Sequence, residues 1–288
     1  MSLATRKREH VSPEAWCQLI GRRCGLTFRD AQIPAVLQYV NGQIQASGAV
    51  DERGYYELLS AEPDGGPEWT ALVEHLLNHE TSFFRHPPSF EAVGKHILPE
   101  LREGRGRGSR LNFLSAGCAT GQEAYSLAMV AMDEDDLGNF TVWGADISRQ
   151  AIDVARRGRY GPRAIAGVPS AYRTRFVRTI ENNSPTPNYE IAEELRRRVR
   201  FSTANLIAQG GVNLNYDIIF CHNVLIYMAP PAVSQVVALL AARLSLGGYL
   251  MLGPGENPVE RPTALEPITA GGVRMLRRRS AAPAEVRS

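Results

Sequence analysis

Apolar residues recur at every third or fourth position through much of the first hundred residues, which is the spacing of one face of an α-helix. Pro67, a residue favoured in the first helical turn, precedes the clearest of these runs. Its apolar members are Trp69, Leu72, Val73, Leu76 and Leu77. Runs with the same spacing lie at 16–20, 33–40 and 90–101. We therefore predict a helical domain over residues 1–86, followed at 87–110 by a helix and a Gly/Arg-rich linker.

Beyond residue 110 the pattern changes to short apolar runs of strand length, which alternate with helical patterns. The strand-like runs are 111–114, 140–143, 216–221 and 249–252. This alternation predicts an α/β fold with a parallel, doubly wound sheet over residues 111–280. Residues 170–200 interrupt it with two prolines and two short β-like pieces, which predicts a small antiparallel insertion. The last residues, 281–288, are predicted to form a disordered tail.

Composition limits the class of protein further. The chain has 288 residues, of which 44% are hydrophobic and 22% charged, and these values are typical of a globular protein with a buried core. The best candidate for a membrane span, 236–252, is interrupted by Arg243 and two glycines, and no apolar run follows the basic N-terminus. The four cysteines form no CxxC pair, which favours free thiols over a disulfide framework or a zinc site. We expect a cytoplasmic monomer that is not inserted into a membrane.

The net charge of +2 conceals one strongly basic segment. Residues 156–200 contain eleven arginines and four glutamates. Such a segment is either a docking surface for an acidic partner, protein or nucleic acid, or a solvated face in a protein that uses arginine in place of lysine. The charge pattern alone leaves both interpretations open.

A loop of small residues, 115–121, follows the first strand-like run. Gly117 and Gly121 tolerate positive φ angles and let a ligand lie against bare backbone at the carboxyl end of a strand. The loop matches neither the GxGxxG pattern nor a phosphate-binding loop, which requires Gly-Lys-Ser/Thr. It favours a ligand with an adenosine and a charged tail but no pyrophosphate. A plain turn between a strand and a helix would have the same composition.

Polar residues follow two other strand-like runs, at what should be the same edge of the sheet. Asp146 lies where a carboxylate receives both hydroxyls of a ribose, and it also precedes a predicted helix that it could cap. His222 and Asn223 directly follow the run at 216–221. A lone histidine at such a position is more often a structural residue than a catalyst, and Tyr227 has packing as its simplest role.

The segment NHETSFFRHPPSF, residues 78–90, combines adjacent aromatic residues with an arginine at a helix end. Arg85 is the candidate for binding the carboxylate tail of a ligand. His75 and His79 are four residues apart, so on one helix they would share a face and could bind a metal. Because no third ligand is evident nearby, we expect no metal.

Four motifs together resemble the CheR family of methyltransferases. HETSFFR is similar to the family's NETxFFR, and SAGCATGQEAYSLAM is similar to its cofactor loop SxGCxTGEExYSLAM. YDIIFCHNVLIY resembles YDxIFCRNVLIYF, and LGGYLMLGPGE resembles PGGxLxLGxxE. The motifs occur in the family's order between Asn78 and Glu256, and the helical N-terminal part and the insertion also match in position.

The resemblance implies a Rossmann-like S-adenosylmethionine methyltransferase domain with a small antiparallel β insertion, preceded by an all-α domain. It implies S-adenosyl-L-methionine as cofactor and methylation of glutamate side chains on the cytoplasmic domain of a methyl-accepting chemosensory receptor, which the insertion helps to hold. Together with the loop glycines and the two histidines that replace family residues, the cofactor-binding set is His79, Thr81, Arg85, Gly117, Gly121, Glu123, Asp146, Asn205, Leu206, His222, Asn223 and Val224. Tyr227 matches a family tyrosine near the transferred methyl, and Arg85 or Arg102 is the candidate for orienting the carboxylates.

Three departures from the family pattern indicate a divergent branch, for which the pilus-motility branch represented by PilK is a candidate. His79 replaces an asparagine, His222 an arginine and Gln122 a glutamate. Two rival functions share the fold or the ligand: a nucleic-acid methyltransferase, and a regulatory module that binds S-adenosylmethionine without transferring its methyl. Against the first, residues 222–225 read His-Asn-Val-Leu and lack the Asn/Asp-Pro-Pro-Tyr pattern of exocyclic-amine methylation.

Overall fold

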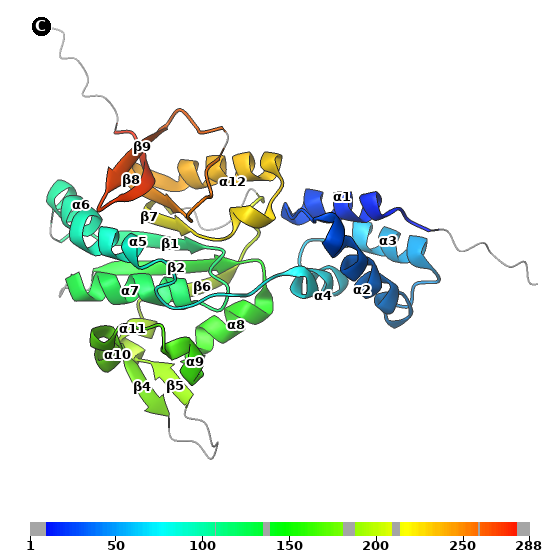
Figure 1. Cartoon of the computed structure of the whole chain (residues 1–288), viewed down its shortest axis with the longest axis horizontal. Helices are drawn as coiled ribbons and strands as arrows, with labels where there is room; N and C mark the ends of the chain where they lie inside the picture. Colours follow the sequence, from blue (N-terminus) through cyan, green and yellow to red (C-terminus); the bar gives the residue numbers. More distant parts are fainter. Residues whose placement is uncertain are drawn as a thin grey trace, which may run out of the picture. The chain divides into compact units, whose positions relative to one another are not determined.

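Two units make up the described part of the chain (Figure 1). The computed structural model describes residues 10–106, 108–134, 139–180, 188–208, 214–258 and 260–280. The first unit extends to Asn78 and also contains Tyr227–Ala232. The second unit contains His79–Ile226 and the chain from Val233 onward.

Helices form the first unit. They are α1 (Pro13–Cys24), the 3₁₀-helix η1 (Asp30–Gln32), α2 (Ile33–Ala46), α3 (Glu52–Ala61) and α4 (Pro67–Leu76). Local signals set the ends of α1: the Ser12 hydroxyl accepts a hydrogen bond from the Ala15 N–H (3.2 Å), and Gly25 ends the helix with a φ of 78°. Trp16 and Leu59 are fully buried, and the Trp16 indole N–H donates to Glu52 Oε1 (2.9 Å). The apolar spacing therefore marks the faces along which these helices pack.

Helix α4 ends before the second histidine of the suggested metal pair. Its last residue is Leu76 and its C-cap is Leu77, so His79 lies beyond the helix. The shared helix face expected for His75 and His79 is therefore not formed. The His75 ring instead stacks on Tyr39, with ring centroids 4.1 Å apart.

A seven-stranded sheet forms the centre of the second unit, in the order β6-β2-β1-β7-β8-β10-β9. Its strands are β1 (Leu111–Ala116), β2 (Phe140–Asp146), β6 (Val199–Thr203), β7 (Tyr216–Cys221), β8 (Leu244–Leu252), β9 (Leu265–Ala270) and β10 (Val273–Arg278). The first five in this order pair in parallel, whereas β10 pairs antiparallel with both β8 and β9. The parallel, doubly wound sheet is thus confirmed, and the β9–β10 hairpin is an addition that the apolar pattern did not reveal.

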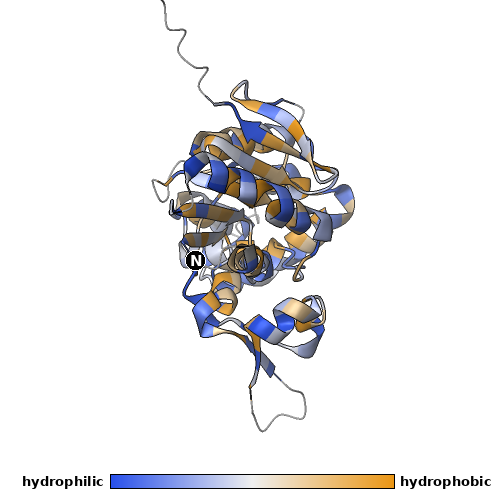
Figure 2. Cartoon of the chain, turned by 90° about the vertical axis from the view of Figure 1, so that its left-hand side faces the viewer, coloured by the Kyte–Doolittle hydropathy of each residue, from blue (hydrophilic) through white to orange (hydrophobic). Residues whose placement is uncertain are grey.

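Helices cover the large sheet. They are α5 (Pro87–Ala92), the π-helix η2 (Val93–Ile97), α6 (Leu98–Arg105), α7 (Gln122–Glu134), α8 (Arg149–Arg157) and α12 (Pro230–Arg243). The short 3₁₀-helix η3 (Leu225–Tyr227) precedes α12 in the chain. Figure 2 shows polar and apolar residues alternating along the helices. Every residue of β7 is buried, which is the pattern of a central strand covered on both faces. No helix among the described residues is both long and apolar enough to cross a membrane.

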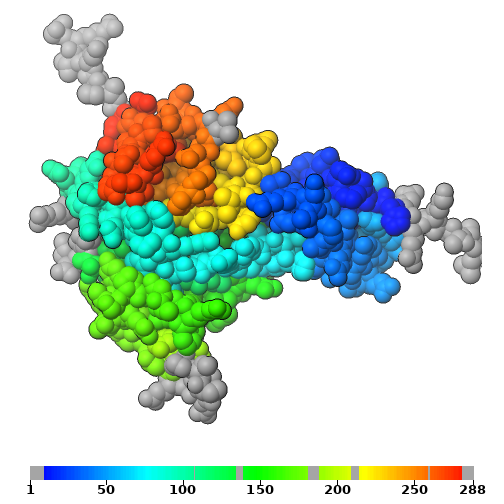
Figure 3. Space-filling model, in the orientation of Figure 1, coloured from blue at the N-terminus to red at the C-terminus, as the bar shows by residue number. Residues whose placement is uncertain are grey.

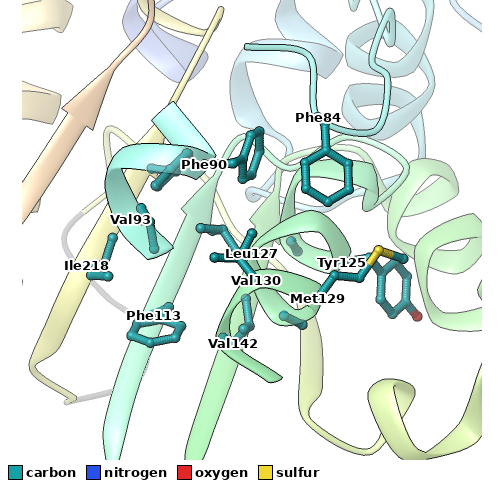
Figure 4. Packing of buried hydrophobic residues seen from close by; sticks show 14 of the residues in the cluster. Phe84, Phe90, Val93, Phe113, Tyr125, Leu127, Met129, Val130, Val142 and Ile218 are labelled. Atoms are coloured by element: carbon teal, nitrogen blue, oxygen red, sulfur yellow. The ribbon is translucent and has the colours of Figure 1, made fainter. Parts of the chain in front are cut away.

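The main core lies between α5, α7 and one face of the sheet. Figure 4 shows Phe84 and Phe90 over Leu127 of α7, with Phe113 of β1 below them. In Figure 3 the α5–α6 segment lies between the C-terminal hairpin and the region of the small sheet. Phe113 is 1% exposed, so replacing it by alanine should cost about 3–5 kcal/mol of folding free energy. The same packing holds the segment before α5 in place.

A three-stranded antiparallel sheet follows α8, in the order β3-β5-β4. Its elements are β3 (Arg159–Tyr160), α9 (Pro162–Ile165), α10 (Ser170–Phe176), β4 (Val177–Ile180), β5 (Asn188–Ile191) and α11 (Glu193–Arg196). The antiparallel insertion predicted at 170–200 is therefore present, although β3 precedes that range and 170–176 is helical. In Figure 1 the small sheet and the C-terminal hairpin lie at opposite ends of the second unit. The prolines at 185 and 187 and the tail at 281–288 lie outside the described residues.

The domain limits stay predictions. The sequence places the end of the helical domain at 86 and the start of the α/β domain at 111, and both positions fall inside the second unit, which begins at His79.

Candidate cofactor site

The carboxyl ends of β1, β2 and β7 meet at one edge of the large sheet. These strands are parallel neighbours, so the loops that follow them emerge side by side. The N–H groups of Gly117 and Cys118 both donate to the Ala145 carbonyl (2.7 and 3.0 Å), which ties the loop after β1 to the end of β2. A Cβ on Gly117 would overlap the Val224 side chain, so the turn after β7 lies directly against the same loop. The three segments singled out in the sequence thus converge.

The glycine loop, residues 117–121, has a conformation that few other residues would permit. Gly117 and Gly121 have φ angles of 75° and 92°. A Cβ on Gly121 would lie 2.7 Å from the Ala155 Cβ, so this position is also closed sterically. Both glycines are therefore required by the path of the backbone, which brings the N-terminus of α7 to the sheet edge.

Asp146 stabilises that loop through both carboxylate oxygens. Oδ2 accepts a hydrogen bond from the Ala119 N–H (2.8 Å), and Oδ1 accepts one from the Ser148 N–H (2.9 Å). The cap of α8 is Ser148, whose hydroxyl accepts from the Ala151 N–H (2.9 Å), so Asp146 is not the capping residue. Each carboxylate oxygen can accept more than one hydrogen bond, which leaves acceptor capacity for ribose hydroxyls.

Glu123, in the first turn of α7, carries the second carboxylate at this edge. The Ser115 hydroxyl donates to its Oε1 (2.7 Å), and His222 Nδ1 lies 3.5 Å from its Oε2. Burial raises the pKa of Glu123 to about 8, and the Glu256 carboxylate adds to this increase, whereas Ser115 and Arg85 act in the opposite direction. A cation bound beside Glu123 would favour its ionised form.

His222 is a neutral group in this environment. Its side chain is 4% exposed and its ring lies 4.6 Å from that of Phe220. Burial, with His86 and Arg85 nearby, lowers its pKa to about 3. The ring therefore stays neutral near pH 7. Its Nε2 is buried and has no hydrogen-bond partner among the described residues.

The HETSFFR segment is anchored by its aromatic residues. Phe84 has a φ of 49°, and its N–H donates to the Ser126 hydroxyl (3.0 Å). Its ring stacks on Tyr172 with centroids 5.2 Å apart, and the Phe83 ring meets Tyr160 edge-on. Both phenylalanines are buried in the core.

Arg85, which follows the two phenylalanines, is exposed and donates from Nη1 to the Glu80 carbonyl (2.9 Å). Its charge lowers the pKa of both Glu123 and His222, which places it close to the sheet edge. His79 and Thr81 are partly buried on the segment that leads to it.

Asn205 and Leu206 follow β6, the strand beside β2. The Ala204 N–H donates to the Asp146 backbone carbonyl (2.8 Å), which places the start of this loop at the end of β2. Asn205 Oδ1 accepts from the Ile207 N–H (3.3 Å), and the Ile207 carbonyl accepts from the Gln235 side chain (2.6 Å). The structure therefore brings this pair to the same edge as Asp146.

One of the candidate catalytic residues lies at the other edge of the sheet. Arg102, in α6, donates to the Ser109 carbonyl just before β1 and acts electrostatically on Asp217, so it lies at the amino-terminal edge of the sheet. The structure does not bring Arg102 into the cofactor site, because β1 separates it from the glycine loop. Tyr227 belongs to the first unit, where the Asn78 side-chain amide donates to its hydroxyl (3.2 Å).

One residue of this edge was not selected from the sequence. Glu256 is 5% exposed, and its carboxylate accepts four hydrogen bonds from backbone N–H groups. It is the last residue of the motif LGGYLMLGPGE, and its position soon after the end of β8 was the available signal.

The donor set fits S-adenosylmethionine, which carries a net positive charge and an adenosine. Carboxylates at Glu123 and Asp146 suit a cationic ligand that contains a ribose. The described residues contain no group of three or more metal-binding side chains.

Comparison with known proteins identifies the family. The family model "CheR methyltransferase, SAM binding domain" matches residues 79–271. A probable biofilm formation methyltransferase, WspC of Pseudomonas aeruginosa, is 32% identical over 92% of this chain and 62% of its own length. A probable chemotaxis protein methyltransferase of Rhizobium etli is 29% identical, over 81% of this chain and 87% of that protein. A chemotaxis protein methyltransferase of Klebsiella aerogenes is 28% identical, over 83% and 81%.

The present chain thus spans about 62% of the length of WspC but most of the two chemotaxis proteins. The family model covers well over half of the chain and includes the glycine loop, Asp146 and the turn after β7. The chain therefore belongs to the CheR methyltransferase family, and most of the residues that match the family's S-adenosylmethionine-binding domain lie in its second unit.

Proposed function

We propose that this protein transfers a methyl group from S-adenosylmethionine to glutamate side chains on the cytoplasmic domain of a methyl-accepting chemosensory receptor. The products would be glutamate methyl esters and S-adenosylhomocysteine. The main support is the convergence of Glu123, Asp146 and the turn after β7 on one sheet edge, within a family whose relatives include chemotaxis protein methyltransferases. The cytoplasmic location is part of this proposal, because the substrate glutamates would lie there.

The proposed cofactor contacts follow from the chemistry of each side chain. Asp146 would accept the ribose hydroxyls, and Glu123 would bind the ammonium group of the amino-acid tail. Arg85 and Thr81 would bind its carboxylate. The roles of His79, His222, Asn205, Leu206, Asn223 and Val224 as cofactor contacts, and that of Tyr227 near the acceptor, stay predictions from the resemblance.

Little acid–base chemistry is required of the protein. S-adenosylmethionine supplies an electrophilic methyl group on a sulfonium centre. A glutamate with an ordinary pKa of about 4.3 is already ionised at neutral pH, so no general base is needed to activate it. The residues of the site would therefore contribute by aligning the acceptor carboxylate, for which Arg85 is the candidate, and by excluding water. The buried Phe83 and Phe84 fix the position of Arg85.

Receptor docking by the small sheet is a separate part of the proposal. Several arginines of the 156–200 segment are engaged within the protein: Arg175 pairs with Asp133 (3.0 Å), and Arg159 and Arg196 both pair with Glu190 (3.0 and 3.4 Å). Arg173 lies over the Tyr189 ring (5.5 Å) of β5. We therefore propose Arg173 as the first residue to replace when docking is tested.

The test is methyl transfer to cytoplasmic receptor fragments from the same organism, with cofactor labelled on the methyl group. We expect label that alkali releases as volatile methanol, because glutamate methyl esters are base-labile. Stable label would indicate methylation of nitrogen, and label on RNA or DNA would support the nucleic-acid rival. Calorimetric binding of the cofactor without transfer to any receptor would support the regulatory module. The pilus-motility branch and the monomeric state stay predictions.

A further inference from the structure

The turn that follows β7, residues 223–226, is held by a single buried carboxylate. Glu256 Oε2 accepts hydrogen bonds from the N–H groups of Asn223 (2.7 Å) and Gly253 (2.9 Å). Its Oε1 accepts from Val224 (2.9 Å) and Ile226 (3.2 Å). Three of the four donors thus belong to this turn, and one carboxylate accepts from all of them.

The turn cannot satisfy these donors by itself. Asn223 has a φ of 58°, in the left-handed region, so the backbone leaves the strand conformation directly after His222. Three N–H groups then point toward one place in the interior, and a buried donor without an acceptor is strongly unfavourable. The two oxygens of a carboxylate have enough acceptor sites for all of them.

Glu256 and the glycine loop both contact this turn. The Val224 side chain packs where a Cβ of Gly117 would be. A shift of the turn would therefore change how closely Val224 packs against the glycine loop. The Glu256 carboxylate also acts electrostatically on Glu123 and helps to raise its pKa. The carboxylate is therefore coupled to the cofactor edge by contact and by charge, although it is itself buried.

We infer that Glu256 is a positioning residue of the cofactor site: by accepting the Asn223, Val224 and Ile226 N–H groups, it fixes the turn against the glycine loop in the form that binds S-adenosylmethionine. It acts through the turn and does not contact the reacting atoms. The inference rests on cofactor binding at this edge and not on the identity of the methyl acceptor.

Gly253 donates the fourth hydrogen bond to Glu256 and lies against its carboxylate. A Cβ at this position would overlap the Glu256 carboxylate and lie 3.0 Å from the Asn223 nitrogen. Its φ is not in the left-handed region, so the backbone itself would accept alanine. Gly253→Ala therefore displaces the carboxylate while keeping its charge and all four donors in the chain.

The test compares Glu256→Gln with Asp217→Asn in the whole 288-residue chain. Asp217 is a buried carboxylate at the other end of β7, where Oδ2 accepts from the Asn112 N–H (2.8 Å) and Oδ1 pairs with Arg105. In Glu256→Gln the side-chain NH₂ would face two N–H donors in either orientation. We expect the Kd for S-adenosylmethionine, measured by calorimetry, to rise at least tenfold in Glu256→Gln. In Asp217→Asn the Kd should stay within twofold of the wild-type value, even if the Tm of this variant falls as far as that of Glu256→Gln.

Two results would overturn the inference. One is a folded Glu256→Gln protein with a Kd within twofold of the wild type; the other is an equal loss of affinity in Asp217→Asn, which would reveal general loosening of the sheet. If Glu256→Gln does not fold, Gly253→Ala decides: a tenfold weaker Kd supports the inference and an unchanged Kd rejects it.

Turnover gives an independent readout. A cofactor contact that is less well positioned should raise the KM for S-adenosylmethionine. The kcat at saturation should stay within about threefold of the wild-type value, because the cofactor loses the same binding free energy in the ground state and in the transition state. A wild-type protein that binds the cofactor but methylates no receptor would reject the proposed function and leave this inference intact.

Discussion

The two edges of the large sheet both contain buried carboxylates, but the groups that stabilise them differ. At the amino-terminal edge Asp217 pairs with the guanidinium group of Arg105 and accepts one backbone N–H. At the carboxyl edge Asp146 and Glu256 accept backbone N–H groups, and Glu123 accepts the Ser115 hydroxyl. An N–H or O–H donor stabilises a carboxylate without adding the full positive charge that a guanidinium brings.

This difference separates a structural edge from a binding edge. A buried carboxylate that is paired with arginine offers little to a ligand, since its charge is already compensated. Acidic groups that accept only N–H or O–H donors have no paired guanidinium, so a bound cation can compensate their charge. The replacement of the family's arginine by a neutral His222 increases this contrast, because it removes a positive charge beside Glu123.

The largest effect should follow from removing Asp146. In Asp146→Ala the Ala119 and Ser148 N–H groups lose their acceptor, and the proposed ribose contact is lost as well. We expect the Kd for S-adenosylmethionine to rise at least about 100-fold, roughly 2.7 kcal/mol, in calorimetry. The control is Ser148→Ala, which removes the cap of α8, costs about 1 kcal/mol of stability and should leave the Kd within threefold. If both variants lost the same affinity, Asp146 would act on cofactor binding only through the stability of the loop and of α8, and the proposed ribose contact would be wrong.

The amino-terminal edge should respond in stability and not in binding. Arg105→Leu leaves the Asp217 carboxylate, 1% exposed, without its guanidinium partner. Because Arg105 is itself partly exposed, we expect a loss of about 2 kcal/mol in unfolding free energy at pH 7, measured with urea, and an unchanged cofactor Kd.

The pH dependence of this loss has a definite sign. Burial already raises the pKa of Asp217 in the folded protein, and removing Arg105 raises it further. The carboxyl is neutral well below its unfolded pKa, so the loss should be smallest in acid and grow as the pH rises through the folded pKa. A loss that is equally large in acid would contradict the ion-pair explanation.

Much of this architecture could be predicted from the sequence, because local patterns determine it. The alternation of strand-like and helical runs predicted the parallel sheet, and the small residues of 115–121 predicted a loop at its carboxyl edge. Asp146 was predicted to lie at that edge because it comes shortly after the apolar run at 140–143. The hairpin of β9 and β10 was missed since its strands alternate exposed and buried residues without a long apolar run.

What could not be predicted depends on contacts between distant residues. Arg102 and Arg85 look equivalent as arginines near motifs, and only the path of α6 shows that Arg102 lies at the wrong edge. The role of Glu256 depends on donors about thirty residues earlier in the chain. The neutrality of His222 depends on burial, which a residue letter does not reveal.

Glu123 gives a smaller effect that depends on pH. Its pKa of about 8 means that the carboxyl is largely protonated in the free protein at pH 6.5. A bound ammonium group favours the ionised form, so cofactor binding should release a proton. The Kd should weaken as the pH falls from 7.5 to 6, by up to about tenfold per unit.

Calorimetry in buffers with different ionisation enthalpies measures the released proton directly. Glu123→Gln should bind more weakly at pH 7.5 and show almost no pH dependence in this range. Glu266→Gln, a substitution on the partly exposed strand β9, serves as the control. Its Kd should depend on pH as strongly as that of the wild type. Equal slopes in wild type and Glu123→Gln would assign the titration to another group.

His222→Gln should give the smallest effect and is the sharpest test of what happens at the carboxyl edge. Because the His222 ring is already neutral above pH 5, with a pKa of about 3, replacing it by a neutral amide removes no charge. We expect the Kd for S-adenosylmethionine to change less than threefold at pH 7 and its pH dependence to keep the slope set by Glu123. His222→Arg, which introduces the family's residue, should instead lower the pKa of Glu123, because a guanidinium beside Glu123 would stabilise the ionised carboxylate, as Arg105 does for Asp217. The proton release at pH 7 would then largely disappear. If His222→Gln removed the pH dependence while His222→Arg kept it, the titrating group would be the histidine, and the contrast between a charge-compensated and an uncompensated edge would have to be abandoned.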